Sequence, residues 1–200
     1  MTCLTEQAFY DLSDVPRLRP LHDHWREIAA EAAALADTRM PIQRDGKDHT
    51  EVARDVMAYL QSGGDYGWML GWGPGSVPER WTQFGLMMDD APIPMAQPVA
   101  PRTLSLLDGI GGIHVGAFLR MEPHTFLPVH RHPELRPAGL LQMHITLEAA
   151  PDANYAYLNV EGTFRQHRLG EPIIFDGALD HFAVNASHHR RTILYLEFKR

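Results

Sequence analysis

The sequence predicts a mainly β fold, a sandwich or barrel of short strands, with helices packed outside it. Two observations lead to this prediction. In the first third of the chain, apolar residues recur at steps of three and four, as along one face of a helix. From residue 112 onward the apolar period becomes two, in short segments separated by turn residues, which is typical of all-β sandwiches and barrels.

The length of the chain favours one folded unit, because 200 residues match one ordinary domain. We therefore expect a single domain over residues 1–200. Within it, residues 1–111 would form a helical and irregular part, and residues 112–200 would form the β core that carries the functional site.

The first third of the chain predicts two helices. The first covers residues 16–36, where Asp14 can cap the start and Pro16 suits the first turn. Its apolar stripe consists of Leu18, Leu21, Trp25, Ile28, Ala32 and Leu35. The second covers residues 50–61 and ends at a Ser-Gly-Gly sequence.

The middle of the chain, residues 62–101, is rich in glycine, proline and tryptophan and predicts mostly turns. One strand is expected at 81–88 and one short helix at 101–109. The tryptophans at positions 68, 72 and 81 would suit the mouth of a substrate site, although burial in the core is the more frequent role of a single tryptophan.

The second half of the chain predicts a series of strands, each apolar or alternating. They cover residues 113–120, 124–130, 140–147, 155–160, 163–168, 171–175 and 192–198.

Composition limits the partners and the compartment. The formal net charge is −7, which argues against a nucleic-acid or anionic-membrane partner. With Cys3 as the single cysteine, no intramolecular disulfide or thiolate-rich zinc site can form. No apolar run approaches the ~18–20 residues of a membrane span, and no signal peptide is evident. A reducing, cytoplasmic location is expected.

Histidines gather in the second half, where nine of the twelve follow residue 113. His130 and His132 flank an arginine in FLPVHRHPELR, and His181 lies about fifty residues further on, just after a predicted strand. Histidines from separate strands can converge inside a barrel, and oxygen-using metals favour such sites with few protein ligands. Taken one at a time, these residues also fit surface histidines on turns.

The order of motifs in this half resembles a known family. Prolines 123 and 128 precede His130, then come His144-Ile-Thr-Leu, Phe175-Asp leading to His181, and Arg191 before an apolar strand. This order resembles the aspartyl/asparaginyl β-hydroxylase family of iron(II)- and 2-oxoglutarate-dependent oxygenases. The resemblance covers most of the chain and is strongest from 112 to 198.

The resemblance implies a double-stranded β-helix, which is a cupin-like jelly roll. It also implies that His130 and His181 hold Fe(II), that Arg191 pairs with the distal carboxylate of 2-oxoglutarate, and that His144 contacts the same cosubstrate. The planar fork of an arginine suits a carboxylate. The implied reaction is hydroxylation of an aspartyl/asparaginyl-type or related small-molecule or peptidyl substrate, with release of succinate and CO2.

Two positions depart from the family pattern. His132 stands where many 2-oxoglutarate oxygenases carry a carboxylate, so it is a bystander, a third nitrogen ligand or a substrate contact; Glu134 is a less favoured oxygen ligand. Gln142 stands where the family often has an arginine that contacts the cosubstrate. Arg136 or Arg120 would then have to supply the missing charge.

Two alternatives stay open. The spacing His130-Arg-His132 is also that of cupins, so a cupin metalloenzyme with a three-histidine site could hold Mn, Ni, Zn or Fe without 2-oxoglutarate. In that case Arg191 would be dispensable and His132 essential. A non-catalytic binding module is the other alternative, because of Gln142.

Other polar residues near these motifs have simpler explanations. A turn accounts for Asp176, and Asn185 and Ser187 suit hydrogen-bond acceptors in the following loop. Arg131 or Arg136 would suit a substrate carboxylate.

Overall fold

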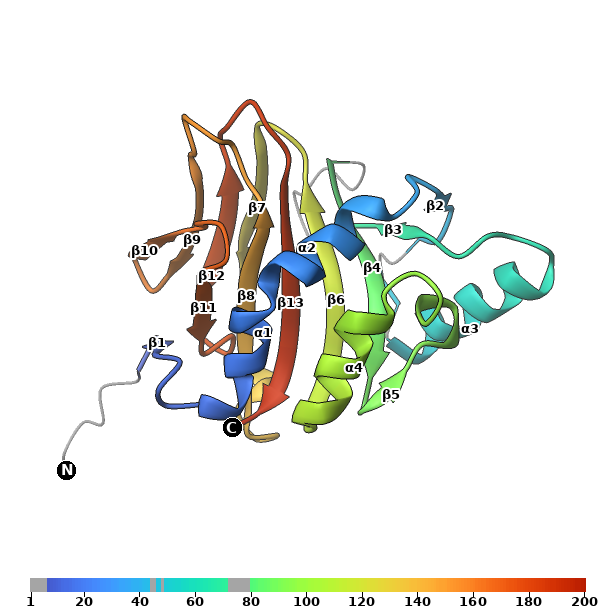
Figure 1. Cartoon of the computed structure of the whole chain (residues 1–200), viewed down its shortest axis with the longest axis horizontal. Coiled ribbons are helices and arrows are strands. Elements are labelled where there is room, and N and C mark those ends of the chain that lie inside the picture. The colour runs from blue at the N-terminus through green and yellow to red at the C-terminus, as the bar shows by residue number, and fades with distance from the viewer. Residues whose placement is uncertain (1–6, 44–45, 48, 72–79) are drawn as a thin grey trace.

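The computed structural model describes residues 7–43, 46–47, 49–71 and 80–200, with His49 and Thr50 described by their backbone alone. Trp72 lies outside these residues, so its expected place near a substrate mouth is not part of the description. The predicted mainly β fold is confirmed. Strands form two sheets, and helices cover one face of the larger sheet (Figure 1).

The larger sheet has nine described strands in the order β1-β11-β8-β13-β6-β4-β3-β2, with β5 paired to β4. Its strands are β1 (Phe9–Tyr10), β2 (Arg39–Met40), β3 (Trp68–Leu70), β4 (Trp81–Met88), β5 (Ala91–Pro92), β6 (Ile113–Met121), β8 (Leu140–Glu148), β11 (Pro172–Phe175) and β13 (Arg191–Lys199). The smaller sheet has the order β10-β9-β12-β7. Its strands are β7 (Thr125–His130), β9 (Ala156–Val160), β10 (Thr163–Gln166) and β12 (His181–Asn185).

The helices follow the predicted ranges with one interruption. They are α1 (Arg19–Asp23), α2 (Trp25–Ala34), α3 (His49–Gln61) and α4 (Pro101–Ile110), with short 3-10 turns η1 (Pro16–Leu18), η3 (Pro94–Ala96) and η4 (Pro133–Leu135). The helix expected over 16–36 is therefore divided into η1, α1 and α2. Asp14 does not cap it; its carboxylate accepts a hydrogen bond from the backbone of Asp11 instead. In the described ranges no helix is long and apolar enough for a membrane crossing.

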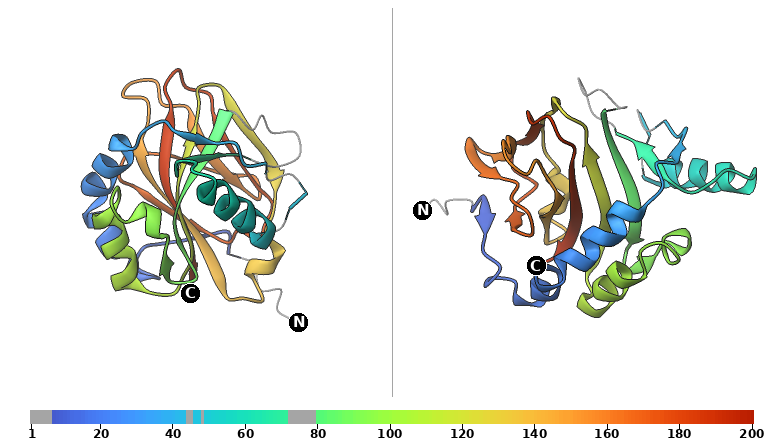
Figure 2. Two further views of the ribbon diagram at one scale, coloured as in Figure 1. Left: turned by 90° about the vertical axis from the view of Figure 1, so that its right-hand side faces the viewer. Right: turned by 45° about the horizontal axis from the view of Figure 1, so that its top comes forward.

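One apolar cluster lies between the larger sheet and the helices. Figure 2 shows α2 and α4 on the same side of that sheet. Because side chains alternate along a strand, β8 turns Leu141, Met143 and Ile145 toward α2. The same alternation turns Gln142 and His144 to the opposite face. Trp68 is buried in this cluster, which confirms a core role for it.

A second apolar cluster lies between the two sheets. Met121 and Phe175 come from the larger sheet, and Leu158 and Ala183 come from the smaller one. Trp81 belongs to this cluster and is buried, so it too is a core residue. The two sheets thus enclose an interior, as in the double-stranded β-helix that the resemblance implied.

The strand predictions missed the shortest strands. β12 begins at His181, which we expected to follow a strand, and β1, β2, β3 and β5 have two or three residues each. The strand expected over 163–168 ends at Gln166, so that His167 lies just beyond it.

Candidate metal centre

Three histidines meet at one end of the interior. His130 is the last residue of β7 and His181 is the first of β12, and the two are direct partners in the antiparallel register. Their ring centroids are 4.3 Å apart, and the ring of His132 lies 5.4 Å from His130 and 5.7 Å from His181. One ring nitrogen from each lies within 4.8 Å of the other two, a spacing that fits a shared metal ion. The interpretation as separate surface histidines is wrong.

The hydrogen bonds of these rings leave one nitrogen of each available. Nδ1–H of His130 donates to the carbonyl oxygen of Pro128 and Nδ1–H of His181 donates to that of Leu179, both at 2.8 Å. Nδ1 of His132 lies 3.2 Å from the carboxylate of Glu134. A partner on Nδ1 fixes the tautomer and ring orientation of a metal-binding histidine. Within the part of the chain that the structure describes, the Nε2 lone pairs are therefore available to a ligand, and Glu134 orients His132.

The loop that carries His132 is tied to the turn between β11 and β12. The backbone N–H of His132 donates to the carbonyl of Gly177 at 2.8 Å. Gly177 packs directly on Gln142: a Cβ at this glycine would lie 2.3 Å from Oε1 of that side chain. A larger residue at position 177 would require the side chain of Gln142 to shift, so the close approach of this turn depends on a small residue.

Burial keeps His130 and His181 uncharged. Burial lowers the pKa of His181 to about 3, with the nearby His130 contributing in the same direction. Burial also lowers the pKa of His130, and the neighbouring His132 lowers it further. The neutral imidazole is the form that binds metals, so both rings are ready to act as ligands at neutral pH.

Acidification is expected to destabilise the metal-free protein through His181. Its pKa is about 3 in the folded chain and near the ordinary 6.5 after unfolding. Between these values the unfolded state binds the additional proton, so the stability contribution is complete above pH 6.5 and is lost as the pH falls toward 3. Thermal unfolding at about pH 7 and about pH 5 measures the effect.

His181→Gln should lose less stability than the wild type over this interval, because glutamine does not titrate. His124→Gln, at an exposed histidine before β7, is the control and should follow the wild type. An equal loss in the His181→Gln variant and the wild type would contradict this explanation.

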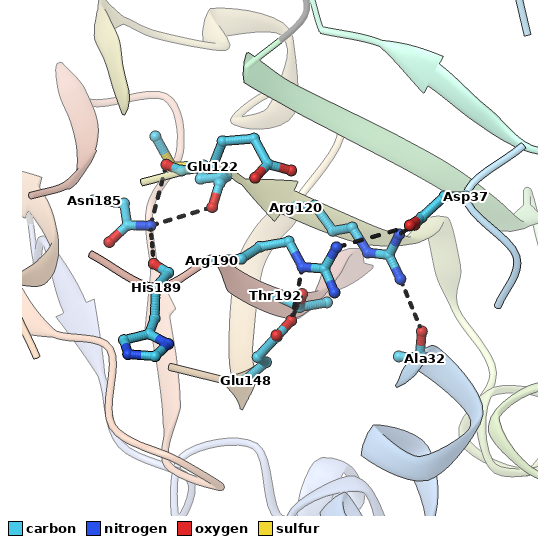
Figure 3. Close-up of polar contacts among 10 residues, drawn as sticks. Ala32, Asp37, Arg120, Glu122, Glu148, Asn185, His189, Arg190 and Thr192 are labelled. Carbon is cyan, nitrogen blue, oxygen red and sulfur yellow. Dashed lines mark hydrogen bonds and ion pairs between the residues drawn. The ribbon is translucent and has the colours of Figure 1, made fainter. Parts of the chain in front are cut away.

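Arg191 is buried at the start of β13 and points into the interior. Its neighbours explain the direction: Arg190 and Thr192 both contact the carboxylate of Glu148, at 3.1 and 2.6 Å, and alternation turns Arg191 the other way (Figure 3). Nη2 of Arg191 contacts the sulfur of Met121. Nε and Nη1 are buried and have no hydrogen-bond partner within the described part of the chain.

A buried guanidinium without an anion is energetically costly. Burial lowers the pKa of Arg191 to about 9, so it still carries its charge at neutral pH. Two buried N–H donors and one uncompensated positive charge together suit a carboxylate that enters the interior.

The loop before Arg191 is fixed by Asn185. Its side-chain amide donates to the carbonyls of Met121 and Glu122, both at 3.2 Å, and of His189 at 2.9 Å (Figure 3). Asn185 also accepts from the backbone of Ser187 at 3.2 Å. The expected acceptor role of Asn185 is confirmed, and its donor contacts join the ends of β6 and β12 around Arg191.

His144 lies between the two ends of the interior. It is buried in the middle of β8, opposite Tyr195 of β13. The ring of Phe175 lies 5.0 Å from His144 and 5.3 Å from His181. Burial first, and then the neighbouring Arg191, His181 and His130, hold its pKa well below the usual value. The cosubstrate contact that the resemblance implied for His144 stays a prediction.

His167 is a buried residue near His144 that the sequence motifs did not predict. Nε2 of His167 lies 3.2 Å from Nδ1 of His144. No motif includes His167, and only the general enrichment in histidine pointed toward it.

Arg120 and Arg136, the two residues expected to replace the family arginine, are both engaged in other contacts. Arg120 is on the opposite face of the larger sheet, where it contacts Asp37 at 2.5 Å and the carbonyl of Ala32 at 3.2 Å (Figure 3). Its guanidinium lies 3.7 Å from the ring centroid of Trp68. The expectation that Arg120 compensates for Gln142 is therefore wrong.

Arg136 forms an ion pair with Asp176 at 2.8 Å. The other oxygen of Asp176 accepts from the backbone of Ala178, so this aspartate is a turn residue as expected. Arg131 lies 3.9 Å from the carboxylate of Asp180 and is largely exposed.

Comparison with known proteins decides the family. The family model described as Aspartyl/Asparaginyl beta-hydroxylase matches residues 22–200. The chain belongs to this family. An ornithine lipid ester-linked acyl 2-hydroxylase of Rhizobium tropici is 27% identical over 123 residues, which are 62% of this chain and 43% of the relative. The chain thus aligns with less than half the length of this hydroxylase.

Solved structures with some likeness include KdgF from Halomonas sp., with a TM-score of 0.41 and 11% identity over 67% of this chain and 87% of that one. The cupin domain of Schizosaccharomyces pombe Cnp3 gives a TM-score of 0.42 and 10% identity, over 65% and 74%. The Cupin_2 domain of a transcriptional regulator from Enterobacter cloacae gives 0.41 and 13%, over 60% and 98%.

Proposed function

We propose that this chain, acting as one oxygenase domain, is an iron(II)- and 2-oxoglutarate-dependent hydroxylase. One observation carries the proposal. Among the described residues, a buried arginine with two unpartnered donors, Arg191, shares an interior with three histidines that use Nδ1 for hydrogen bonds within the chain. A divalent metal would bind the three histidines, and a dicarboxylic acid bound to that metal would place its second carboxylate at Arg191.

The donor set suits iron. Imidazole nitrogens bind iron, zinc, copper and nickel, and oxygenase iron sites use few protein ligands so that positions remain open. In our proposal His130 and His181 are the principal ligands, because they sit on paired strands. His132 is the third. Three protein nitrogens leave open positions on an octahedral ion for a cosubstrate and oxygen.

When bound, iron(II) with 2-oxoglutarate and oxygen would supply the oxidising power to hydroxylate a C–H bond, with release of succinate and CO2. The residues of the chain bind and orient. Arg191 would bind the distal carboxylate with its buried guanidinium, and His144 would offer a second polar contact. Met121 and Phe175 keep water away from this charged contact, which strengthens it.

The substrate belongs, in our proposal, to an aspartyl/asparaginyl-type or related small-molecule or peptidyl class. The name of the Rhizobium relative adds the fatty-acyl chain of a lipid as a further candidate. Arg131 and Arg136 would meet a substrate carboxylate only by exchanging their contacts with Asp180 and Asp176.

A second candidate function is a cupin metalloenzyme that does not use 2-oxoglutarate. The presence of His132 in the cluster favours it, because a three-histidine centre serves metals other than iron equally well. In that case the loss of Arg191 would leave activity unchanged.

The deciding experiment measures succinate formation from 2-oxoglutarate in the presence of iron(II). Aspartyl peptides, asparaginyl peptides and an ester-linked acyl lipid would be supplied separately. We expect succinate at a rate that one substrate class stimulates, and a hydroxylated product of that class by mass spectrometry. No succinate with any substrate, together with no 2-oxoglutarate binding by calorimetry, would refute the proposal.

A further inference from the structure

His167 is a buried histidine in a rigid position. It has no exposed surface and follows β10 directly. Its backbone N–H donates to the carbonyl of Ala156 at 2.9 Å, and its carbonyl accepts from the side chain of Asn154 at 2.7 Å. Both bonds hold the ring against His144, inside the sandwich.

The two imidazoles lie end to end. Nε2 of His167 and Nδ1 of His144 are 3.2 Å apart, and the ring centroids are 5.5 Å apart with an angle of 20° between the planes. This near-coplanar geometry suits one N–H···N hydrogen bond. Burial, helped by the charge of Arg191, holds the pKa of both rings well below the usual value, so both are neutral. A single hydrogen therefore lies between them.

The second ring nitrogen of His167, Nδ1, indicates which of the two rings carries the shared hydrogen. Nδ1 of His167 is buried and has no partner in the described ranges of the chain. If His144 donated, the hydrogen of His167 would sit on this Nδ1 as a buried, unpaired N–H, an arrangement that folded proteins avoid. If His167 donates from Nε2, its Nδ1 is only an unused acceptor, which costs less.

We propose that His167 is a positioning residue that fixes His144 in the Nε2–H tautomer. A neutral imidazole that accepts on Nδ1 carries its hydrogen on Nε2. His144 thereby becomes a hydrogen-bond donor to a carboxylate in the interior, next to the donors of Arg191. The identity of that carboxylate as 2-oxoglutarate rests on the proposed function; the tautomer does not. The pair supplies a neutral hydrogen-bond donor, not the positive charge of the arginine that the family often has at position 142.

The first test needs no variant of His167. Long-range ¹H–¹⁵N correlation spectra of the metal-free protein, labelled in histidine with ¹⁵N, distinguish Nδ1–H from Nε2–H. His144 is assigned by the signals that disappear in His144→Asn. We expect His144 and His167 both as Nε2–H tautomers. An Nδ1–H tautomer at His144 would overturn the inference, whatever ligand the protein binds.

The second test compares His167→Leu with His167→Gln. Leucine removes the donor, whereas the glutamine amide reaches the same nitrogen and restores it. We expect the dissociation constant for 2-oxoglutarate, measured by calorimetry with Mn(II) in place of iron, to rise on the order of tenfold in the leucine variant and to stay near the wild type in the glutamine variant.

Melting temperature and Mn(II) affinity are also measured for both variants. If the role of His167 were purely structural, these two quantities would fall, and the 2-oxoglutarate affinity would not distinguish the variants. Equal 2-oxoglutarate affinity in the two variants would contradict a donor role for His167. If the wild type binds no 2-oxoglutarate, the proposed function is refuted. The NMR spectrum of the metal-free protein still tests whether His144 is the Nε2–H tautomer.

Discussion

Arg191→Met is expected to weaken 2-oxoglutarate binding strongly and, at the same time, to raise the stability of the ligand-free protein. Two donors of the buried guanidinium have no partner among the residues that the structure describes, so its charge is poorly compensated in the ligand-free protein. Replacing buried charges by apolar residues of similar size often raises the free energy of unfolding, by roughly 1–4 kcal/mol. The same change removes a buried, charge-assisted contact, so the dissociation constant should rise on the order of a hundredfold.

Thermal unfolding with and without 2-oxoglutarate measures both effects. The wild type should be stabilised by the ligand, whereas the variant should melt higher without it and gain nothing from it. Arg120→Met is the matched control. That arginine is also buried, but Asp37 and Ala32 accept from its Nη atoms and Trp68 lies against it, although its Nε has no partner among the described residues. Its loss should therefore lower the free energy of unfolding by about 2 kcal/mol.

An Arg191→Met variant that retains 2-oxoglutarate binding would disprove the role of this arginine. A variant that loses nothing in turnover, while His132→Ala loses all of it, would favour the cupin metalloenzyme.

His181→Ala is expected to cause the largest loss of metal. His181 is buried, its Nδ1–H is held by Leu179, and its ring contacts both other histidines of the cluster. Changing even an outer partner of a metal ligand costs ~10–100-fold in affinity, so the loss of this ligand should exceed a hundredfold. His132→Ala should cost less, on the order of tenfold, because it lies on a loop beyond the paired strands.

Competition with a chromogenic chelator gives the affinities, and His124→Ala is the control. His124 contacts the ring of His188 outside the three-histidine cluster, so its replacement should leave metal binding unchanged. Full metal retention by the His181→Ala variant would exclude the proposed centre.

Local patterns in the sequence predict the layers of this fold well. The change from a helical period to a period of two marks the boundary between α4 and the strand-rich half. β12 was missed because HFAVN is short and follows turn residues, and two-residue strands such as β1 carry no period at all. Their existence depends on pairing with strands far away in the chain, which no local window contains.

The candidate site was predictable where a motif marks it. The motifs identified His130, His181 and Arg191, but their convergence depends on the register of β7 with β12 and on the phase of β13. In the sequence, Arg191 belongs to a basic run over residues 188–191 that would suit the surface. Its inward direction becomes evident only because Arg190 and Thr192 both donate to Glu148 on the other face. The face of Arg120 follows from the phase of β6. His167 depends wholly on distant contacts with Asn154 and Ala156.

The two sheets divide the proposed site between them. The smaller sheet contributes His130 and His181, and the larger sheet contributes Arg191 and His144. The span between the two anchoring points is thus a dimension of the whole sandwich, set by how its layers dock. Under the proposed function, the distance between the two sheets determines which length of dicarboxylic acid can reach both the metal and Arg191. No single side chain could lengthen or shorten it alone.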